Sequence, residues 1–302
     1  MCSRLMMMAP LSADDNVMIL EMLLQCGQQA RQAATQSFEV YEKGREDYVT
    51  TVDQSLDRYL AEFFTARFPQ DGIVTEENPV SASEFLAPHT CLWCIDPIDG
   101  TEDFIHRGKN YSVMVGLLTD RHPQAGWVHA PAQNRLYWGG AKWGLFQQDD
   151  EGRTVPLGPC APDGKKRAVI LLGDRDQRHF GAAIQAVLPN LRFHSLGSFG
   201  LKVLEVIKGQ ASLYVYLNGR VKLWDTVGPL ALAEASGLVC CDIDGQPISF
   251  DANSIYPHTL LHRQPIIVGW KEPLQAFLPA IRQAALAVRY EELELGQGFI
   301  YA

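Results

Sequence analysis

Apolar residues near the start of the chain recur with the period of a helix. Ser12 and Asp15 have the spacing of a capping box, and the apolar positions after them predict a helix to about residue 38. A second helix is expected over residues 51–68, where it ends before a proline. Asp53 lies in the first turn of this second helix, where a carboxylate complements the helix dipole. That local role is compatible with a functional one.

Apolar runs in the middle of the chain predict strands. A short strand at residues 73–74 would deliver Glu76 and Glu77 at its end, and this adjacent pair either faces a cation or forms a solvated loop tip. Residues 79–90 contain Pro and Ser and are expected to form a loop. Further strands are expected in the run that ends at Asp96, at residues 111–118, and as an antiparallel meander within residues 125–146.

Strands and helices alternate in the second half of the chain. Strands are expected at residues 168–172, 193–196, 211–217, 239–243 and 266–270, and helices at residues 174–188, 200–208, around 230–235 and at 274–288. The pattern predicts an α/β (α+β) protein with an N-terminal half over residues 1–150 and a C-terminal half over residues 167–302. Residues 151–166, within an Asp-, Gly- and Pro-rich stretch, would connect the halves as a linker or an exposed hairpin.

One stretch combines acidic, turn-forming and helix-starting residues. Asp96 and Asp99 lie three positions apart with Pro97 between them, and Gly100 can supply a tight turn, so both carboxylates can face one point. If a helix begins after Thr101, its free amides face the same point and suit a phosphate. Carboxylates and amides can share an anion only when cations lie between them, and oxygen ligands suit Mg²⁺. The same residues also occur in ordinary turns.

Composition narrows the possible partners. The formal charge of −9 over 302 residues argues against binding the backbone of a nucleic acid polymer, and an acidic protein that acts on an anionic substrate needs bound cations. Met1–Ala9 lacks the pattern of a secretory signal and no apolar run is long enough to span a bilayer, so no membrane association and a cytoplasmic location are expected. Seven scattered cysteines indicate reduced thiols, and the Cys91/Cys94 pair is expected to be buried structurally.

Four separated fragments together resemble a known superfamily. They occur in the order and approximate spacing of the inositol monophosphatase superfamily, and the match runs from about residue 15 to 290: Thr50-Thr51-Val52-Asp53, Glu76-Glu77-Asn78, Asp96-Pro97-Ile98-Asp99-Gly100-Thr101 and Trp224-Asp225-Thr226. Taken alone, Asp225 is explained as a helix cap. The resemblance implies a Mg²⁺-dependent, typically lithium-sensitive phosphomonoesterase. It also implies a layered α-β-α-β-α sandwich of the inositol monophosphatase and fructose-1,6-bisphosphatase type, with the active site between the halves.

The resemblance assigns metal ligands to this chain. It implies that Glu76, Asp96 and the backbone carbonyl of Ile98 hold one Mg²⁺, while Asp96, Asp99 and Asp225 hold a second. A third, looser ion would lie near Glu76, so the expected cofactor is two to three Mg²⁺ ions. Such ions neutralise the charge of a phosphate ester and lower the pKa of an attacking water.

The resemblance also assigns the remaining catalytic roles. Thr101 and Asp53, together with Glu76, would prepare the attacking water, and the amides of Gly100 and Thr101 would receive the phosphate. A homodimer is common among such proteins. A non-catalytic protein that binds a phosphorylated ligand on the same fold is the alternative from a different class.

Within the superfamily, the sequence is more similar to the 3′(2′),5′-bisphosphate nucleotidase branch. The stretches 99–105 and 128–131 carry that likeness and imply 3′-phosphoadenosine 5′-phosphate as the small phosphorylated substrate. Glu102 departs from the usual Lys of this branch, and Asn218 stands where inositol-specific members have a Glu. Lys202 and Lys222 would either meet a second phosphate or be solvated side chains. Inositol monophosphate, histidinol phosphate and sugar bisphosphates are the alternative substrates.

Overall fold

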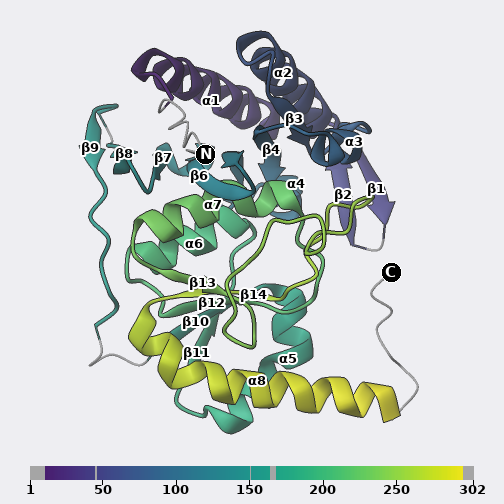
Figure 1. Ribbon diagram of the computed structural model, residues 1–302, viewed down its shortest axis with the longest axis vertical. Helices are drawn as coiled ribbons and strands as arrows, with labels where there is room; N and C mark the ends of the chain where they lie inside the picture. The colour runs from purple at the N-terminus through teal and green to yellow at the C-terminus, as the bar shows by residue number, and fades with distance from the viewer. Residues whose placement is uncertain (1–10, 45, 150, 164–167, 295–302) are drawn as a thin grey trace, which may run out of the picture.

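The protein is built from stacked layers of helices and sheets (Figure 1). The computed structural model describes residues 11–44, 46–149, 151–163 and 168–294. The expectation of no secretory signal concerns Met1–Ala9, which lies outside the described residues. In the part of the chain that is described, no helix is both long enough and apolar enough to cross a membrane.

The helices include the expected ones, among them a short helix that begins at Thr101, and one short helix that was not expected, Ser81–Leu86. Their bounds are α1 (Ala13–Ala34), α2 (Thr51–Arg67), α3 (Ser81–Leu86), α4 (Thr101–Ile105), α5 (Asp174–Val187), α6 (Phe199–Ile207), α7 (Leu223–Ala235) and α8 (Lys271–Glu294), with a 3-10 turn η1 (Pro131–Gln133).

The strands form two larger sheets and one hairpin. Their bounds are β1 (Val40–Gly44), β2 (Asp47–Thr50), β3 (Gly72–Thr75), β4 (Cys91–Asp99), β5 (Ser112–Thr119), β6 (His122–Ala130), β7 (Arg135–Gly140), β8 (Gly144–Gln148), β9 (Thr154–Pro156), β10 (Val169–Leu172), β11 (Arg192–His194), β12 (Leu213–Tyr216), β13 (Val239–Cys241) and β14 (Ile266–Gly269).

The first sheet has the strand order β3-β4-β5-β6-β7-β8-β9. All neighbouring pairs are antiparallel, as the meander predicts, except β3 and β4, which run parallel. Within residues 151–166, β9 pairs with β8 as a hairpin, and the connection of two halves by this segment stays a prediction. The second sheet, β11-β10-β12-β14-β13, mixes parallel and antiparallel pairs.

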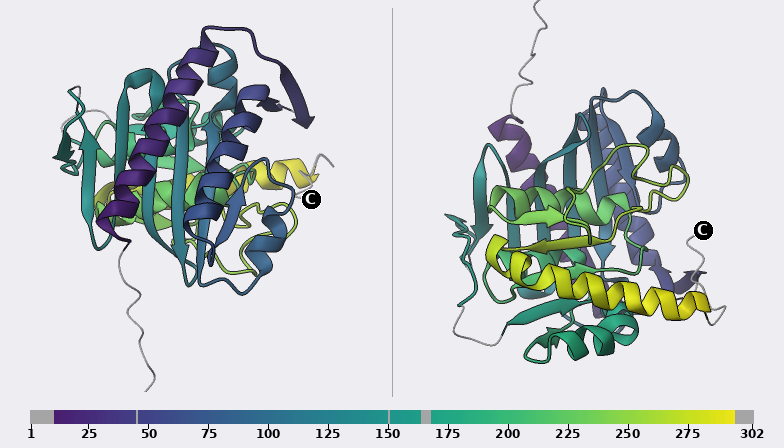
Figure 2. Two further views of the ribbon diagram at one scale, coloured as in Figure 1. Left: turned by 90° about the horizontal axis from the view of Figure 1, so that it is seen from above. Right: turned by 60° about the horizontal axis from the view of Figure 1, so that its bottom comes forward.

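The helices fill the spaces around these sheets. Helices α1 and α2 lie across the outer face of the first sheet, whereas α5 and α8 cover the outer face of the second (Figure 2). Helices α6 and α7 lie between the two sheets and share one apolar core with both. This arrangement confirms the expected α-β-α-β-α layering, and it brings the start of α7 close to the end of β4.

Glycines allow the central helix to approach the first sheet closely. A Cβ atom added at Gly126 on β6 would lie 2.0 Å from the carbonyl oxygen of Gly228 on α7, and one added at Gly116 on β5 would lie 2.3 Å from the amide nitrogen of Gly228. Only a hydrogen fits at such a separation. The contact therefore fixes the position of α7, which carries Asp225, relative to the sheet.

Two local predictions are wrong. The first helix ends at Ala34 instead of about residue 38, because the chain turns there into the hairpin of β1 and β2, which the sequence did not predict. Residues 79–90, expected to be a loop, contain α3. Its first residue, Ser81, exchanges two hydrogen bonds with the backbone of Thr75, and Phe85 is fully buried. Tertiary packing thus stabilises a single short helix in a Pro- and Ser-containing segment.

Candidate active site

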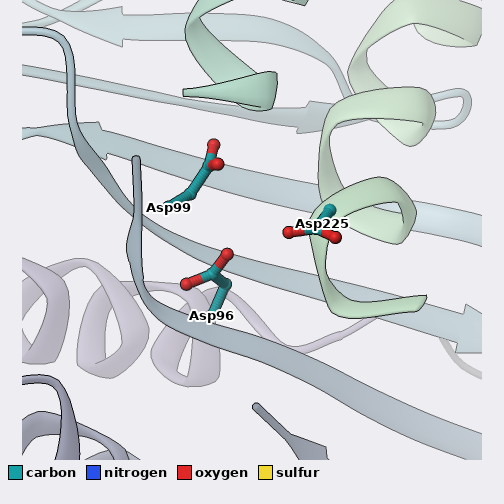
Figure 3. A group of neighbouring side chains, drawn as sticks. All are labelled: Asp96, Asp99 and Asp225. Atoms are coloured by element: carbon teal, nitrogen blue, oxygen red, sulfur yellow. The ribbon is translucent and has the colours of Figure 1, made fainter. Parts of the chain in front are cut away.

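Three carboxylates from two separate parts of the chain converge between the sheets. Asp96 and Asp99 project from the end of β4, and Asp225 projects toward them from the first turn of α7 (Figure 3). Each offers an oxygen atom within 4.8 Å of the oxygens offered by the other two. The structure therefore brings together three of the expected metal ligands.

Backbone geometry at the end of β4 orients the first two carboxylates. The strand continues to Asp99, beyond its expected end at Asp96, but its register with β5 shifts between these two residues. Asp96 Oδ1 accepts a hydrogen bond from the amide of Ile98 at 3.0 Å. Asp99 Oδ2 accepts one from the amide of Gly200 at 3.0 Å and another from the hydroxyl of Ser198. The irregular register allows both side chains to face the same region.

Asp225 does not cap α7 in the way expected from the sequence. Lys222 is the N-cap residue, and Asp225 lies three positions later, where its Oδ2 accepts a hydrogen bond from the amide of Lys222 at 2.6 Å. This is the return half of a capping box, so the prediction of Asp225 as the cap itself is wrong. The bond holds one carboxylate oxygen at the helix start.

The pKa values of these acids reflect burial and mutual repulsion. Burial, followed by the charges of Glu76, Asp99 and Asp225, raises the pKa of Asp96 well above its usual range. Burial, followed by the charges of Asp99 and Glu76, raises the pKa of Asp225 to about 7. Charged carboxylates at this separation need a cation, and an all-oxygen donor set fits a hard divalent ion. The residues present therefore suit a metal centre.

Glu76 extends the acidic region and has an unexpected partner. Its carboxylate lies 2.9 Å from Lys43 Nζ, which also lies 2.7 Å from Glu77. Burial, followed by the charge of Glu76, raises the pKa of Glu77 to about 7. Glu76 and Glu77 thus face a cation, as one of the two sequence interpretations required, although here that cation is a lysine of the β1–β2 hairpin.

Thr101 connects the motif to Asp53. Thr101 Oγ1 lies 3.2 Å from Asp53 Oδ1 and 3.0 Å from the carbonyl oxygen of Ile98. Asp53 also accepts a hydrogen bond from the amide of Thr50, in the capping box of α2. Burial is the main cause that raises the pKa of Asp53 to about 6, and the charge of Glu76 adds to it. Asp53 therefore serves the helix start and contacts the motif at the same time.

The expected helix after the motif begins at Thr101, directly after a left-handed residue. Gly100 has a φ of 89°, and an added Cβ would lie 2.9 Å from the carbonyl oxygen of Asn110. Glycine is favoured in this conformation because it has no side chain. The predicted tight turn is thus confirmed, and it places the backbone of Gly100 and Thr101 beside the acids.

A cavity of about 570 Å³ opens onto this region. Its lining includes eight of the expected site residues: Glu76, Asp99, Gly100, Thr101, Lys202, Asn218, Lys222 and Asp225. Asp96, Asp53 and Ile98 contribute through the contacts described above. The site therefore draws on both sheets and on the helices between and around them.

The three residues expected to meet substrate have different environments. Lys202 is not solvated: its side chain is buried and donates to the carbonyls of Leu196 and Gly197 at 2.6 and 2.9 Å. Lys222 Nζ lies 4.0 Å from Asp47 and above the ring of Trp224. Asn218 accepts a hydrogen bond from the amide of Arg220 at 3.2 Å. All three line the cavity, but Lys202 already has two partners.

Among the charged residues near the cavity that were not predicted from the sequence are Lys43, Arg175 and Arg178. Lys43 belongs to a hairpin whose first strand is exposed throughout, so no apolar pattern marks it. Arg175 and Arg178 belong to the predicted helix α5, and their i, i+3 spacing places them on one face. That spacing is the signal that could have identified the two arginines.

Comparison with known proteins agrees with this geometry. The family model described as the inositol monophosphatase family matches residues 15–286. The chain belongs to this family. It is 30% identical over 237 residues to the 3′(2′),5′-bisphosphate nucleotidase CysQ of Aggregatibacter actinomycetemcomitans, an alignment that covers 77% of this chain and 86% of that protein.

One further curated relative and one solved structure are also similar to this chain, and the solved structure supports the fold. Inositol monophosphatase 1 of Rattus norvegicus is 23% identical over 241 residues, which cover 76% of this chain and 84% of that protein. A solved structure of an IMPase/NADP phosphatase complexed with NADP and Ca²⁺ superimposes with a TM-score of 0.74 at 20% identity, covering 90% of this chain and 97% of that one. The family member described here is thus a metal-dependent phosphatase with the expected layered fold.

Proposed function

We propose that this phosphatase uses Mg²⁺ to hydrolyse a 3′(2′),5′-bisphosphate nucleotide, converting 3′-phosphoadenosine 5′-phosphate to AMP. The observation that carries the proposal is the convergence of Asp96, Asp99 and Asp225 beside a cavity that is large enough for a small phosphorylated metabolite. The likeness to a CysQ protein at 30% identity supports the choice of substrate.

The chain supplies a suitable set of ligands for two to three Mg²⁺ ions. Asp96, Asp99 and Asp225 would hold one ion, and Glu76 with Asp96 and the carbonyl of Ile98 would hold another. Bound Mg²⁺ supplies charge neutralisation for the phosphate and lowers the pKa of a coordinated water. Lys43 would then share Glu76 and Glu77 with the ions, because its ammonium group contacts both carboxylates.

Thr101 and Asp53 orient the attacking water in this proposal. Thr101 Oγ1 accepts a hydrogen bond from the water, and the Thr101 hydroxyl donates a hydrogen bond to Asp53 Oδ1, 3.2 Å away. The pKa of about 6 for Asp53, raised mainly by burial, lets its carboxylate take up a proton near neutral pH. The amides of Gly100 and Thr101 receive the phosphate at the start of α4.

Two observations bear on the choice between nucleotide and inositol substrates. Asn218 lines the cavity at the position where the resemblance places a Glu in inositol-specific members, which weakens the case for an inositol substrate. The likeness to inositol monophosphatase 1 makes inositol monophosphate the second candidate. Inhibition by Li⁺ and assembly as a homodimer stay predictions from the resemblance.

The experiment measures phosphate release from 3′-phosphoadenosine 5′-phosphate and inositol 1-phosphate side by side, with Mg²⁺ and with EDTA. We expect release only with Mg²⁺ and at least a tenfold higher kcat/KM for the nucleotide, about 1.4 kcal/mol in transition-state binding. A preference for inositol 1-phosphate would replace the nucleotide proposal with the second candidate. If both are poor substrates, histidinol phosphate and sugar bisphosphates are tested next.

A further inference from the structure

A pair of arginines lines the same cavity as the acids. Arg175 and Arg178 lie near the start of α5, and both guanidinium groups contact the carboxylate of Glu46. Arg175 Nε lies 2.8 Å from Glu46 Oε2, and Arg178 Nη2 lies 3.4 Å from the same oxygen. Arg175 also donates to the backbone carbonyl of Glu46. One carboxylate therefore shares two guanidinium groups at the edge of the cavity.

These arginines contribute little to the folded core. The side chains of Arg175, Arg178 and Glu46 are 31%, 63% and 45% exposed. Ion pairs at such exposure contribute little to stability, because water screens them. An anion with more charge than a carboxylate can therefore replace Glu46 at small cost.

The shape and charge of this pair suit a phosphate. A guanidinium group presents its donors in a planar fork that matches phosphate oxygens, and two such groups on one helix face can share a dianion. The carboxylate of Glu46 accepts hydrogen bonds from these guanidinium groups, and its charge is smaller than that of a phosphate dianion. Because Glu46 follows the exposed strand β1, the hairpin can release its carboxylate without disturbing a buried layer.

The two lysines expected to meet a second phosphate are less suitable. Lys202 is 4% exposed and directs its ammonium group at two carbonyl oxygens. Lys222 lies between Asp47 and the ring of Trp224. Moving Lys202 onto a ligand would break both hydrogen bonds, and Lys222 offers a single ammonium group. Arg175 and Arg178 offer two guanidinium groups that can exchange the carboxylate of Glu46 for a ligand, while Arg175 keeps its bond to the Glu46 carbonyl.

We propose that Arg175 and Arg178 bind the second phosphate of a bisphosphate substrate and that Glu46 holds this position until the substrate displaces it. The proposal rests on the proposed function, since the acids would bind the phosphate that is hydrolysed and the arginines the phosphate that is retained. Arg175 and Arg178 are then specificity-determining residues, and Glu46 competes with the substrate.

The test compares 3′-phosphoadenosine 5′-phosphate with 3′-AMP, which lacks the second phosphate. For the double variant Arg175→Gln/Arg178→Gln, we expect the ratio of kcat/KM for the bisphosphate to that for 3′-AMP to fall at least about tenfold, because two charged hydrogen-bond donors are lost. For Glu46→Gln, we expect KM for the bisphosphate to fall at least about threefold, because a competing charge is removed. Melting temperatures establish that the variants are folded.

Arg153→Gln provides the matched control. Arg153 is 70% exposed and pairs with Asp149 and Glu151 in the turn between β8 and β9, and it does not line the cavity. Its loss makes the net charge more negative, as the double variant does. The selectivity ratio of Arg153→Gln should stay within about twofold of the wild-type ratio. A ratio that falls less than tenfold in the double variant, or that falls equally in Arg153→Gln, overturns the arginine subsite.

The design separates failure of the subsite from failure of the proposed function. If the wild-type enzyme releases no phosphate from either nucleotide, the nucleotide proposal fails on its own. The same variants are then compared on fructose 1,6-bisphosphate and fructose 1-phosphate. A tenfold fall in the kcat/KM ratio of fructose 1,6-bisphosphate to fructose 1-phosphate in the double variant supports the arginine subsite, with a sugar bisphosphate as its ligand. An unchanged ratio overturns the subsite.

Discussion

The cavity region has an acidic wall, formed by Asp96, Asp99 and Asp225, and a basic wall, formed by Arg175 and Arg178. Different interactions hold the two walls in place. Asp96, Asp99 and Asp225 are oriented by backbone amides, on a strand and a helix that pack within the layered core. Arg175 and Arg178 are held by an exposed carboxylate on a hairpin. The first wall is set by the fold itself, whereas the second can exchange its partner for a ligand. In the functions proposed above, the acidic wall would carry the chemistry and the basic wall would select the substrate.

Removing one central carboxylate should have the largest effect. Asp96→Asn keeps an oxygen for the amide of Ile98 but removes a charged ligand of the proposed metal centre. We expect kcat to fall at least about 10³-fold, which is about 4 kcal/mol of transition-state stabilisation. Phosphate release under saturating Mg²⁺ measures the effect.

The matched control is Asp14→Asn, which removes an exposed carboxylate from the first turn of α1. Its kcat should equal that of the wild type. In EDTA, Asp96→Asn should melt no lower than the wild type, because burial and the neighbouring acids already favour an uncharged group at this position. Full turnover by Asp96→Asn would contradict the role given to the acidic wall.

Thr101→Ala should have the next largest effect. The substitution removes the hydroxyl that lies between Asp53 and the carbonyl of Ile98, so the water loses its orienting group. We expect a fall in kcat of about 100-fold, or about 2.7 kcal/mol. Thr101→Ser keeps the hydroxyl and should retain activity within about fivefold. Equal kcat values for the Ala and Ser variants would show that the hydroxyl is not used.

Gly126→Ala tests whether packing sets the acidic wall. The new methyl group would overlap the carbonyl oxygen of Gly228, so α7 must shift and carry Asp225 with it. We expect a loss of roughly 1–3 kcal/mol in the free energy of unfolding, together with reduced activity. Gly158→Ala is the control, because nothing lies within 4 Å of the added Cβ. Urea denaturation that finds the two variants equally stable would contradict the close packing of α7.

The smallest predicted effect concerns pH. In the folded chain burial raises the pKa of Asp53 to about 6 and that of Asp225 to about 7, whereas the unfolded chain loses these protons near pH 4. The metal-free fold therefore holds more protons, and these acids make it less stable as pH rises from about 4 to about 7. Mg²⁺ requires the deprotonated carboxylates, so its stabilising effect should grow over the same range.

The measurement is the rise in melting temperature on adding Mg²⁺, compared at pH 5.5 and pH 7.5. Burial lowers the pKa values of His129 and His262 to about 4 and about 3, so these residues change stability with pH in the opposite direction. Their contribution cancels because each rise compares samples with and without Mg²⁺ at the same pH. We expect the rise to be several degrees larger at pH 7.5. An equal rise at both pH values would indicate that the metal does not bind these acids.

The sequence predicted the acidic wall better than the basic one for a physical reason. Asp96, Asp99 and Gly100 belong to one local motif whose turn geometry follows from neighbouring residues, and Glu76 follows a short strand. The identification of Asp225 depended on the resemblance, because its local pattern indicates only a helix start. Its exact position in the capping box came from the structure.

The basic wall depends on contacts between distant segments. Glu46 and Arg175 are 129 positions apart, and the hairpin that carries Glu46 has no apolar alternation to reveal it. Lys202 illustrates the same limit from the other side: a lysine on an apolar helix suggested a solvated or substrate-facing group, but the loop before α6 buries it against two carbonyls. Local pattern cannot show which segments meet.

The most direct test of the account is to locate the metal. A crystal of the wild-type protein soaked with Mn²⁺ and inorganic phosphate would show the ions by their anomalous scattering. We expect one peak between Asp96, Asp99 and Asp225 and a second peak beside Glu76. In Asp96→Asn, which lacks a ligand proposed for both ions, we expect both peaks to be lost. A phosphate bound in the cavity of the wild type with no peak among these three carboxylates would contradict the account.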